Sequence, residues 1–371
     1  MSALFDLMPM SALAAAAAMS FLVNLLVLAT LPRHHHLSLD STFCPQKNHE
    51  QPTPRIGGLG VMAGLLAGCA LVYPACFSLL GPLLLAGLPA FVFGLAEDLT
   101  KRVSVRARLL ATLSCGVLGY LITGYSITDV NVPGIDWLLS FSLLSVVFTA
   151  FAVGGVANAL NIIDGMNGLA SGVVIIVLVG FAVLCHDLGD TDLMLACCIL
   201  AVSVVGFFLV NWPLGKIFLG DGGACFLGFA LAWLAVLLLA RHAEVSAWAP
   251  LLACGFPILE VVFSMLRRRR RCQKVGDPDC LHLHSLIHRR LVRRLLPQAS
   301  PLARNSITGV LVSCAGVLPV WMAVRWATDT PMLVIGFALC ALIYSATYAR
   351  LTQFRWCFGA VTLRRPADAS I

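Results

Sequence analysis

Long apolar runs recur along the whole chain, and the short loops between them carry most of the charge. A run of roughly 17–25 apolar residues has the length that an α-helix needs to cross a bilayer. The sequence therefore predicts an all-α, polytopic membrane protein, with a single multi-pass domain over residues 1–371. We expect about eleven spans, near residues 11–31, 56–73, 80–96, 107–125, 138–157, 169–186, 193–210, 223–240, 249–266, 306–326 and 332–349.

The composition excludes a chain built mainly of soluble domains. Hydrophobic residues make up 59% of the sequence and charged residues 12%, whereas soluble proteins are about a quarter charged. The first apolar run has no basic segment before it and leads into further runs, so we expect a span rather than a cleaved signal peptide. The fourteen cysteines contain no C-x-x-C pair and lie mostly in apolar runs, which favours buried hydrophobic roles.

The distribution of basic residues predicts the orientation in the membrane. Nearly all lysines and arginines fall in the loops on one side, and the exceptions are Arg241 and Arg325. By the positive-inside rule this side is cytoplasmic, which places the N-terminus outside and the C-terminal tail inside. The orientation upstream depends on a turn indicated by Tyr73-Pro74 and Gly81-Pro82. A net charge of +7 could suggest nucleic acid, but in a membrane protein the distribution of charge matters more than its sum, so we expect no nucleic-acid partner.

Five polar clusters fall on the predicted cytoplasmic side, at the ends of spans. The first, Pro52–Gly60, brings Arg55 to the start of a span, where Gly57 and Gly58 allow a close backbone approach. A plain turn into a packing helix explains this cluster equally well.

The second cluster is the acidic pair Glu97-Asp98 at the end of the third predicted span. Adjacent carboxylates at a helix end suit a divalent cation or a proton transfer, and the following Arg106 and Arg108 suit phosphate oxygens. The alternative is an ordinary juxtamembrane charge cluster, which explains the arginines but not the acids.

The third cluster, Asn158–Ala170, separates two long apolar runs with amides, glycines and one carboxylate. Polar side chains so close to lipid are costly, and we therefore take this stretch as the candidate reaction centre. Its polar residues are Asn158, Asn161, Asp164 and Asn167, and its glycines are Gly165 and Gly168.

The fourth cluster, Lys216–Ala224, sets Asp221 among glycines at the start of a span. Backbone N–H groups and a helix N-terminus suit an anion or a metal-bridged phosphate. Asp221 as a simple N-cap is the alternative, but it leaves Lys216 and the glycines unexplained.

The fifth cluster lies in the long basic loop 267–304. Its five consecutive arginines favour a topology determinant or a contact with anionic lipid. His282 and His284 follow, but no Cys or acidic partner completes a zinc set, so phosphate contact is the better interpretation. Glu260, in the preceding span, is a candidate buried acid.

In this order and at these spacings, the clusters resemble the polyprenyl-phosphate N-acetylhexosamine-1-phosphate transferase family, glycosyltransferase family 4. The resemblance covers residues 45–295, and its most specific part is the N-A-x-N-x-x-D-G-x-x-G-L-A motif at Asn158–Ala170. The F-x-G-D-x-G motif is matched at 218–223, and the D-x-x-H-x-H loop at 279–284. The chain departs from the family's pattern at Glu97 and Glu260, where aspartate is usual, and at Ala224 and Ser285, where serine and histidine are common.

The resemblance implies that a UDP-amino sugar and undecaprenyl phosphate give undecaprenyl-diphospho-sugar and UMP, with Mg²⁺ or alternatively Mn²⁺ as cofactor. It implies that Asp221 and Asn161 bind the metal, that Asp98 with Glu97 acts on the lipid phosphate, and that Asp164 supports the nucleotide. Direct attack by the lipid phosphate and a covalent carboxylate intermediate both fit. The implied phosphate contacts are His282, His284, Arg106 and Arg108, and the implied substrate contacts are Asn158, Asn167, Gly165, Lys216, Arg55, Gly57 and Gly58.

Other functions remain open at this stage. Within the family, the phospho-N-acetylmuramoyl-pentapeptide transferase of peptidoglycan synthesis is the alternative to an enzyme of O-antigen, capsule or teichoic-acid synthesis. A transporter of anionic solutes should show internal repeats and polar sites near the midplane of the membrane. A non-catalytic membrane scaffold would not need several aspartates on the same side of the membrane. The expected location is the bacterial inner membrane with the site on its cytoplasmic face, and a homodimer is compatible with it.

Overall fold

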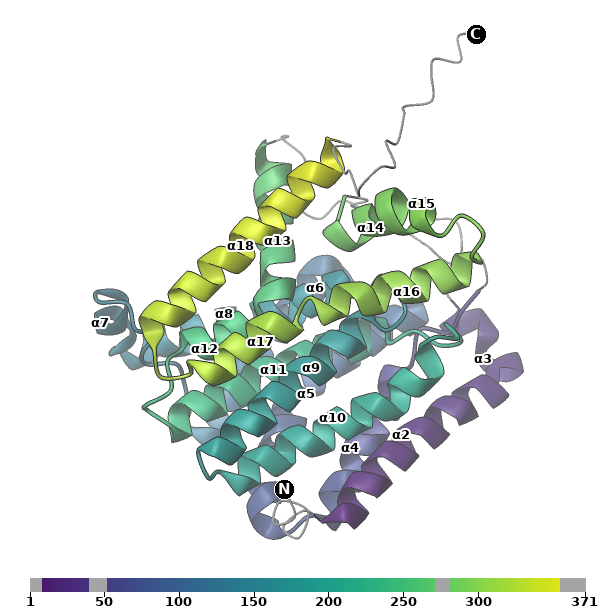
Figure 1. The fold of residues 1–371 in the computed structure, drawn as a ribbon. Coiled ribbons are helices and arrows are strands. Elements are labelled where there is room, and N and C mark those ends of the chain that lie inside the picture. Colours follow the sequence, from purple (N-terminus) through teal and green to yellow (C-terminus); the bar gives the residue numbers. More distant parts are fainter. Residues whose placement is uncertain (1–8, 40–51, 271–280, 354–371) are drawn as a thin grey trace.

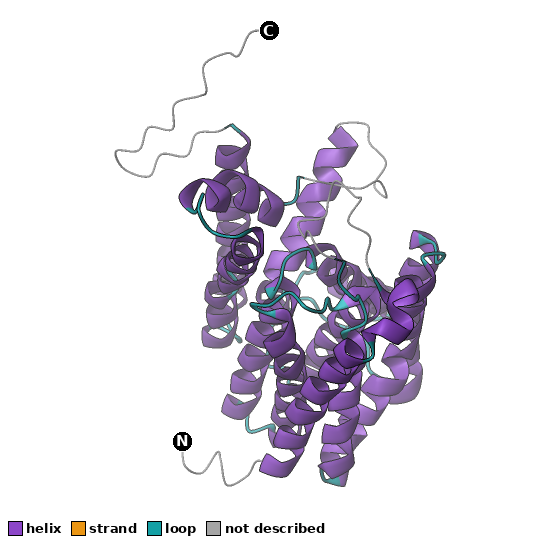
Figure 2. Ribbon diagram, turned by 90° about the vertical axis from the view of Figure 1, so that its right-hand side faces the viewer, coloured by secondary structure: helices purple, strands orange, loops and turns teal. Residues whose placement is uncertain are grey.

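The structure, a computed structural model, describes residues 9–39, 52–270 and 281–353. Within these ranges the regular secondary structure is helical, apart from an isolated bridge between Leu39 and Pro54. Figures 1 and 2 show the long helices packed side by side in a bundle. The long helices are α2 (Met10–Ala29), α5 (Pro74–Thr100), α6 (Val105–Thr123), α8 (Ser142–Ile163), α9 (Leu169–Asp187), α10 (Thr191–Asn211), α11 (Gly220–Arg241), α16 (Pro301–Cys314) with α17 (Val317–Arg325), and α18 (Thr330–Thr352). The shorter elements are α3 (Leu31–Ser38), α4 (Gly58–Leu71), α7 (Ile135–Leu139), α12 (Trp248–Ala253), α13 (Gly255–Arg270), α14 (Leu283–Ile287), the π-helical η1 (His288–Val292) and α15 (Arg293–Leu295).

Nine helical segments in the described ranges are long and apolar enough to cross a membrane, and α4 is a shorter apolar helix. The predicted all-α, polytopic membrane fold is therefore confirmed, although the number of spans differs from the expected eleven. The second predicted span is the 14-residue α4. The ninth is divided between α12 and α13, and α13 ends in four arginines.

The turn that sets the direction of the first helices lies at Tyr73-Pro74. Helix α4 ends at Leu71 and α5 begins at Pro74. Proline is favoured at the first position of a helix, because an N–H at that position would have no partner within the helix. Pro82 lies inside α5, so the second predicted turn signal does not interrupt the helix.

Helix α11 is the most deeply buried of the long helices and packs against α5 and α8. Small residues allow this close approach: Gly94 of α5 faces Gly222, and Ala157 of α8 faces Gly228. A Cβ on Gly94 would lie 2.5 Å from the Cα of Gly222. Small residues let membrane helices pack this closely. This packing places the N-terminus of α11 between the ends of α5 and α8.

The outer faces of the bundle carry large apolar side chains. Leu110, Leu143, Phe151 and Leu342 are each more than 60% exposed. Apolar surface of this extent suits contact with lipid tails rather than water. The chain is a multi-pass membrane protein.

Candidate active site

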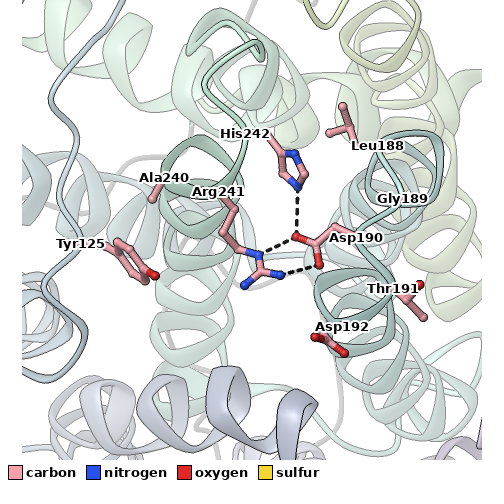
Figure 3. Close-up of a pocket in the computed structure, with 9 residues that line it drawn as sticks. All are labelled: Tyr125, Leu188, Gly189, Asp190, Thr191, Asp192, Ala240, Arg241 and His242. Carbon is pink, nitrogen blue, oxygen red and sulfur yellow. Dashed lines mark hydrogen bonds and ion pairs between the residues drawn. The ribbon is translucent and has the colours of Figure 1, made fainter.

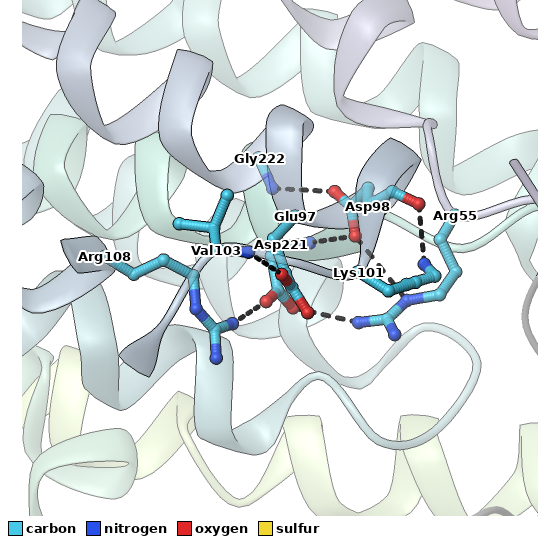
Figure 4. Close-up of polar contacts among 8 residues, drawn as sticks. All are labelled: Arg55, Glu97, Asp98, Lys101, Val103, Arg108, Asp221 and Gly222. Carbon is cyan, nitrogen blue, oxygen red and sulfur yellow. Dashed lines mark hydrogen bonds and ion pairs between the residues drawn. The ribbon is translucent and has the colours of Figure 1, made fainter. Parts of the chain in front are cut away.

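Two arginines and two aspartates from four separate segments meet at one end of the bundle (Figure 4). Arg55 precedes α4, Asp98 lies near the end of α5, and Arg108 and Asp221 lie in the first turns of α6 and α11. Nη2 of Arg55 donates to Oδ1 of Asp221 at 2.9 Å, and Nη1 of Arg108 forms an ion pair with Oδ2. The fold thus joins residues that belong to three different clusters of the sequence.

Asp98 closes the N-terminus of α11. Its Oδ1 accepts the N–H of Asp221 at 3.0 Å, and its Oδ2 accepts the N–H of Gly222 at 2.9 Å. Nε of Arg55 lies 3.6 Å from Oδ1. The first N–H groups of a helix have no partner within the helix, and the helix dipole favours negative charge there. Asp98, which is only 1% exposed, therefore anchors α5 to α11.

Gly220 links this group to the third polar cluster. Its φ is +78°, and a Cβ there would lie 2.0 Å from the carbonyl oxygen of Arg55 and 2.6 Å from Oδ2 of Asp98. Only glycine adopts this conformation without strain. The N–H of Gly220 lies near the carboxylate of Asp164, which follows α8. Burial raises the pKa of Asp164 to about 7, although the charge of Arg55 and the Gly220 N–H oppose the shift.

Amides from two other helices hold the loop between α8 and α9. Oδ1 of Asn305 accepts the N–H of Asn167 at 2.8 Å, and Oδ1 of Asn211 accepts the N–H of Gly168 at 2.7 Å. Asn167 is itself buried, and its Nδ2 donates to Oγ of Ser306 at 3.2 Å. The backbone of the loop is therefore fixed by α10 and α16, and the side chain of Asn167 is part of that support.

His282, His284 and Glu260 form a second group beside this loop. Nδ1 of His282 lies 2.9 Å from Oε1 of Glu260, and the two imidazole rings stack with their centroids 5.5 Å apart. Nε2 of His284 lies 3.0 Å from the position that a Cβ would take on Gly165. The histidines are thus placed next to the candidate reaction centre. Asp279, from the same predicted motif, lies outside the described residues.

Two further predicted site residues connect neighbouring elements. Nδ2 of Asn158 donates to Oγ1 of Thr112 at 2.8 Å, which joins α8 to α6. Oε2 of Glu97 accepts the N–H of Val103 at 2.8 Å, which holds the connection between α5 and α6. Both side chains therefore support the helices that carry the Arg–Asp cluster.

The remaining predicted site residues differ in their burial and in their contacts. Asn161 is half-buried, one turn beyond Ala157 on the face of α8 that packs against α11. Gly57 and Gly58 are buried, and their N–H groups each donate at 2.9 Å to the backbone before α11. The side chains of Arg106 and Lys216 are exposed and form no hydrogen bond or ion pair with any described residue. The structure therefore does not bring Arg106 and Lys216 into the cluster.

Three supporting residues were missed by the sequence analysis: Thr112, Asn211 and Asn305. Each lies within or beside an apolar run, where an isolated polar residue needs a partner. That isolation is the signal that would have found them.

The oxygen donors of the site fit a hard divalent cation. Asp221, Asp164 and the amide of Asn161 offer the carboxylate and carbonyl oxygens that Mg²⁺ prefers. Nowhere in the described ranges do three Asp, Glu, His or Cys side chains form a ready-made metal cage. Mg²⁺ usually takes one or two protein carboxylates and completes its shell with water and substrate phosphates.

A polar depression of about 580 Å³ lies at the opposite end of the bundle, where α11 ends (Figure 3). Nε of Arg241 donates there to Oδ2 of Asp190 at 2.5 Å, and Nη2 of Arg241 donates to Oδ1 at 2.9 Å. Nε2 of His242 lies 3.0 Å from Oδ2 of Asp190. Burial acts to raise the pKa of Asp190, but hydrogen bonds from Arg241, the Leu193 N–H and His242 outweigh it and lower that pKa. This ion pair ties the connection between α9 and α10 to the end of α11, far along that helix from Asp221.

The fold and the site define a class: a multi-pass membrane protein with a charged, oxygen-rich site at one end of its helix bundle. Residues 80–239 match the family described as Glycosyl transferase family 4. This segment contains Asp98, Arg108, Asp164 and Asp221. This segment, which is less than half of the chain, is similar to glycosyl transferase family 4.

The curated relatives are distant. A probable undecaprenyl-phosphate N-acetylglucosaminyl 1-phosphate transferase of Bacillus subtilis (strain 168) is 28% identical, over 64% of this chain and 66% of that protein. The undecaprenyl-phosphate alpha-N-acetylglucosaminyl 1-phosphate transferase of Yersinia pestis is 27% identical, over 66% of this chain and 68% of the relative. The protein of the same description from Escherichia coli O157:H7 is 26% identical, over 81% and 80%.

Proposed function

We propose that this protein transfers a sugar-1-phosphate from a UDP-sugar to undecaprenyl phosphate and releases UMP. The observation that carries the proposal is the convergence of Arg55, Arg108, Asp98 and Asp221 at one end of the bundle. Three of these residues lie in the family-matched segment. The names of the relatives supply the substrate class.

The arginines supply the charge that this reaction needs. A diphosphate must be neutralised before another phosphate can attack it. Guanidinium groups bind phosphate oxygens in a fixed fork geometry, and Arg55 and Arg108 approach Asp221 from two different segments. Nε of Arg108 is buried and has no hydrogen-bond partner among the described residues, so it is a donor available to an anion.

The aspartates have two different roles in this proposal: one would bind the metal, and another supports the metal-binding position. Bound Mg²⁺ would add positive charge at the diphosphate, and Asp221 with Asn161 would hold it. Asp164 supports this position from the end of α8, where the N–H of Gly220 lies near its carboxylate. That Asp98 acts on the lipid phosphate stays a prediction, and its bonds to α11 give it a structural role besides.

The proposal also covers the sugar donor, the product and the location of the site. The donor is an N-acetylated amino sugar nucleotide, and the product begins a cell-envelope glycan. The positive-inside rule places the site on the cytoplasmic face of the bacterial inner membrane, because its loops carry nearly all basic residues.

Reconstitution of the purified protein tests the function. The protein in lipid nanodiscs receives undecaprenyl phosphate, Mg²⁺ and one of three donors: UDP-GlcNAc, UDP-GalNAc or UDP-N-acetylmuramoyl-pentapeptide. We expect UMP release and a diphospholipid product with an amino sugar donor, loss of both with EDTA, and recovery with Mg²⁺ or Mn²⁺. Reactions without the lipid are the control. UMP release from none of the donors, together with anion uptake into vesicles, would support the transporter instead.

A further inference from the structure

Glu260 is a fully buried acid that the proposed reaction does not use. It lies on α13 and has 0% of its surface exposed. Apolar side chains surround this region, including Leu259 and Phe263 of the same helix. A buried carboxylate costs several kcal/mol unless other groups pair with it. The groups that pair with Glu260 therefore indicate what its position serves.

Those groups belong to the start of α14. Oε1 of Glu260 accepts from Nδ1 of His282 at 2.9 Å and from the N–H of Leu283 at 3.0 Å. Oε2 also accepts the Leu283 N–H, at 3.3 Å. One side chain thus fixes both the backbone at residue 283 and the ring of His282.

This pairing decides which nitrogen His282 presents. An ionised carboxylate only accepts hydrogen bonds, so Nδ1 carries the hydrogen and Nε2 is the atom on the other side of the ring. The ring of His284 stacks on it with an interplanar angle of 2°. His284 in turn adjoins Gly165, next to Asp164. The two rings therefore lie between the buried acid and the candidate reaction centre.

We infer that Glu260 is a positioning residue that holds His282 with Nε2 toward a substrate phosphate. The inference rests on the proposed function and extends it to a residue outside the family-matched segment. In the protonated ring, Nδ1–H donates to Glu260 and Nε2–H donates to the phosphate, so both N–H groups are satisfied. The phosphate belongs either to the sugar nucleotide or to the lipid acceptor. Hydrogen-bond partners behind metal-binding histidines typically change activity by about 10–100-fold, and we expect an effect of this kind behind a phosphate-binding histidine.

A double-mutant cycle tests the inference in the reconstituted protein. Glu260→Gln keeps the size of the side chain and an acceptor for Leu283. His282→Asn keeps a donor at the place of Nδ1, so it preserves the bond to Glu260, but it removes Nε2. We expect each single variant to lower kcat/KM about tenfold and the double variant to fall no further, because Glu260 acts through His282. Glu244→Gln, on an exposed side chain at the other end of the bundle, is the control.

The kinetic constants identify the source of the phosphate. A raised KM for the UDP-sugar places His282 on the donor, and a raised KM for undecaprenyl phosphate places it on the acceptor; either result supports the inference. Independent, additive losses in the cycle, or a Glu260→Gln enzyme with wild-type constants, overturn it. If the wild type turns over no donor, the proposed function fails. The same variants are then compared by calorimetric binding of inorganic diphosphate, where reduced binding in both supports the inference and unchanged binding overturns it.

Discussion

The side chain of Asp98 holds the backbone of Asp221: its Oδ1 accepts the Asp221 N–H at 3.0 Å, while its Oδ2 takes the next N–H of the same helix. The two aspartates come from clusters 123 residues apart in the sequence. They form one unit, because Asp98 fixes the first turn of α11 and that turn sets the direction of the Asp221 carboxylate. Changes at Asp98 therefore act on stability and on the geometry of Asp221 together.

Replacement of Asp98 by alanine should lower both stability and activity. The N–H groups of Asp221 and Gly222 lose their acceptor, and loss of a helix cap costs about 0.5–2 kcal/mol. We expect a lower midpoint of thermal unfolding in detergent and little UMP release in nanodiscs. Asp187→Asn, at an exposed position at the far end of α9, should change neither. If Asp98→Ala unfolded at the same temperature as the wild type, the cap would contribute nothing to stability.

Gly220 offers a test of close packing with a matched control. Gly220→Ala adds a Cβ 2.0 Å from the carbonyl oxygen of Arg55, and Gly189→Ala adds one with no atom within 4 Å. Both glycines have a positive φ, +78° and +74°, so the backbone strain is similar. Strain alone costs on the order of 1 kcal/mol in both variants. We expect loss of UMP release only in Gly220→Ala, and equal activity of the two variants would contradict this site geometry.

The ion pair at the opposite end predicts an acid-dependent stability. The pKa of Asp190 is lowered in the folded protein, so its contribution is present above its ordinary pKa of 3.8 and is lost as the pH falls through the folded value. Arg241→Gln removes the main partner. We expect this variant to unfold at a lower temperature than the wild type at pH 7, and the difference to shrink below about pH 4. UMP release at pH 7 should stay near wild type, and a difference in unfolding temperature that does not depend on pH would contradict the ion-pair account.

The fold class followed directly from the sequence because lipid imposes a strict length on apolar helices. The boundaries were harder, since proline marks a turn at Pro74 but lies within a helix at Pro82. Helix α13 is not a full apolar span of membrane-crossing length, because it ends in arginines and continues from α12. A count of apolar runs therefore found each of these segments but did not distinguish a full span from a shorter helix.

For the site, the sequence indicated the chemical groups but not their partners. Arg55, Asp98, Arg108 and Asp221 were all candidates, yet their ion pairs depend on how α11 packs against its neighbours. Residues that act as supports were the least predictable. Asn167 lies in the most specific motif, and the structure buries it against α16.

The central claim is that the cluster around Asp221 is the reaction centre. Asp221→Asn keeps the shape of the side chain but removes the charge that meets Arg55 and Arg108. Asp192→Asn is the same change at the other end of the bundle, where Oδ1 of Asp192 accepts from the Tyr73 hydroxyl at 2.7 Å. The measurement is the initial rate of UMP release from UDP-GlcNAc and undecaprenyl phosphate, with both variants folded to the same extent. We predict a rate at least about 100-fold below wild type for Asp221→Asn and a wild-type rate for Asp192→Asn. A wild-type rate for Asp221→Asn would contradict the account.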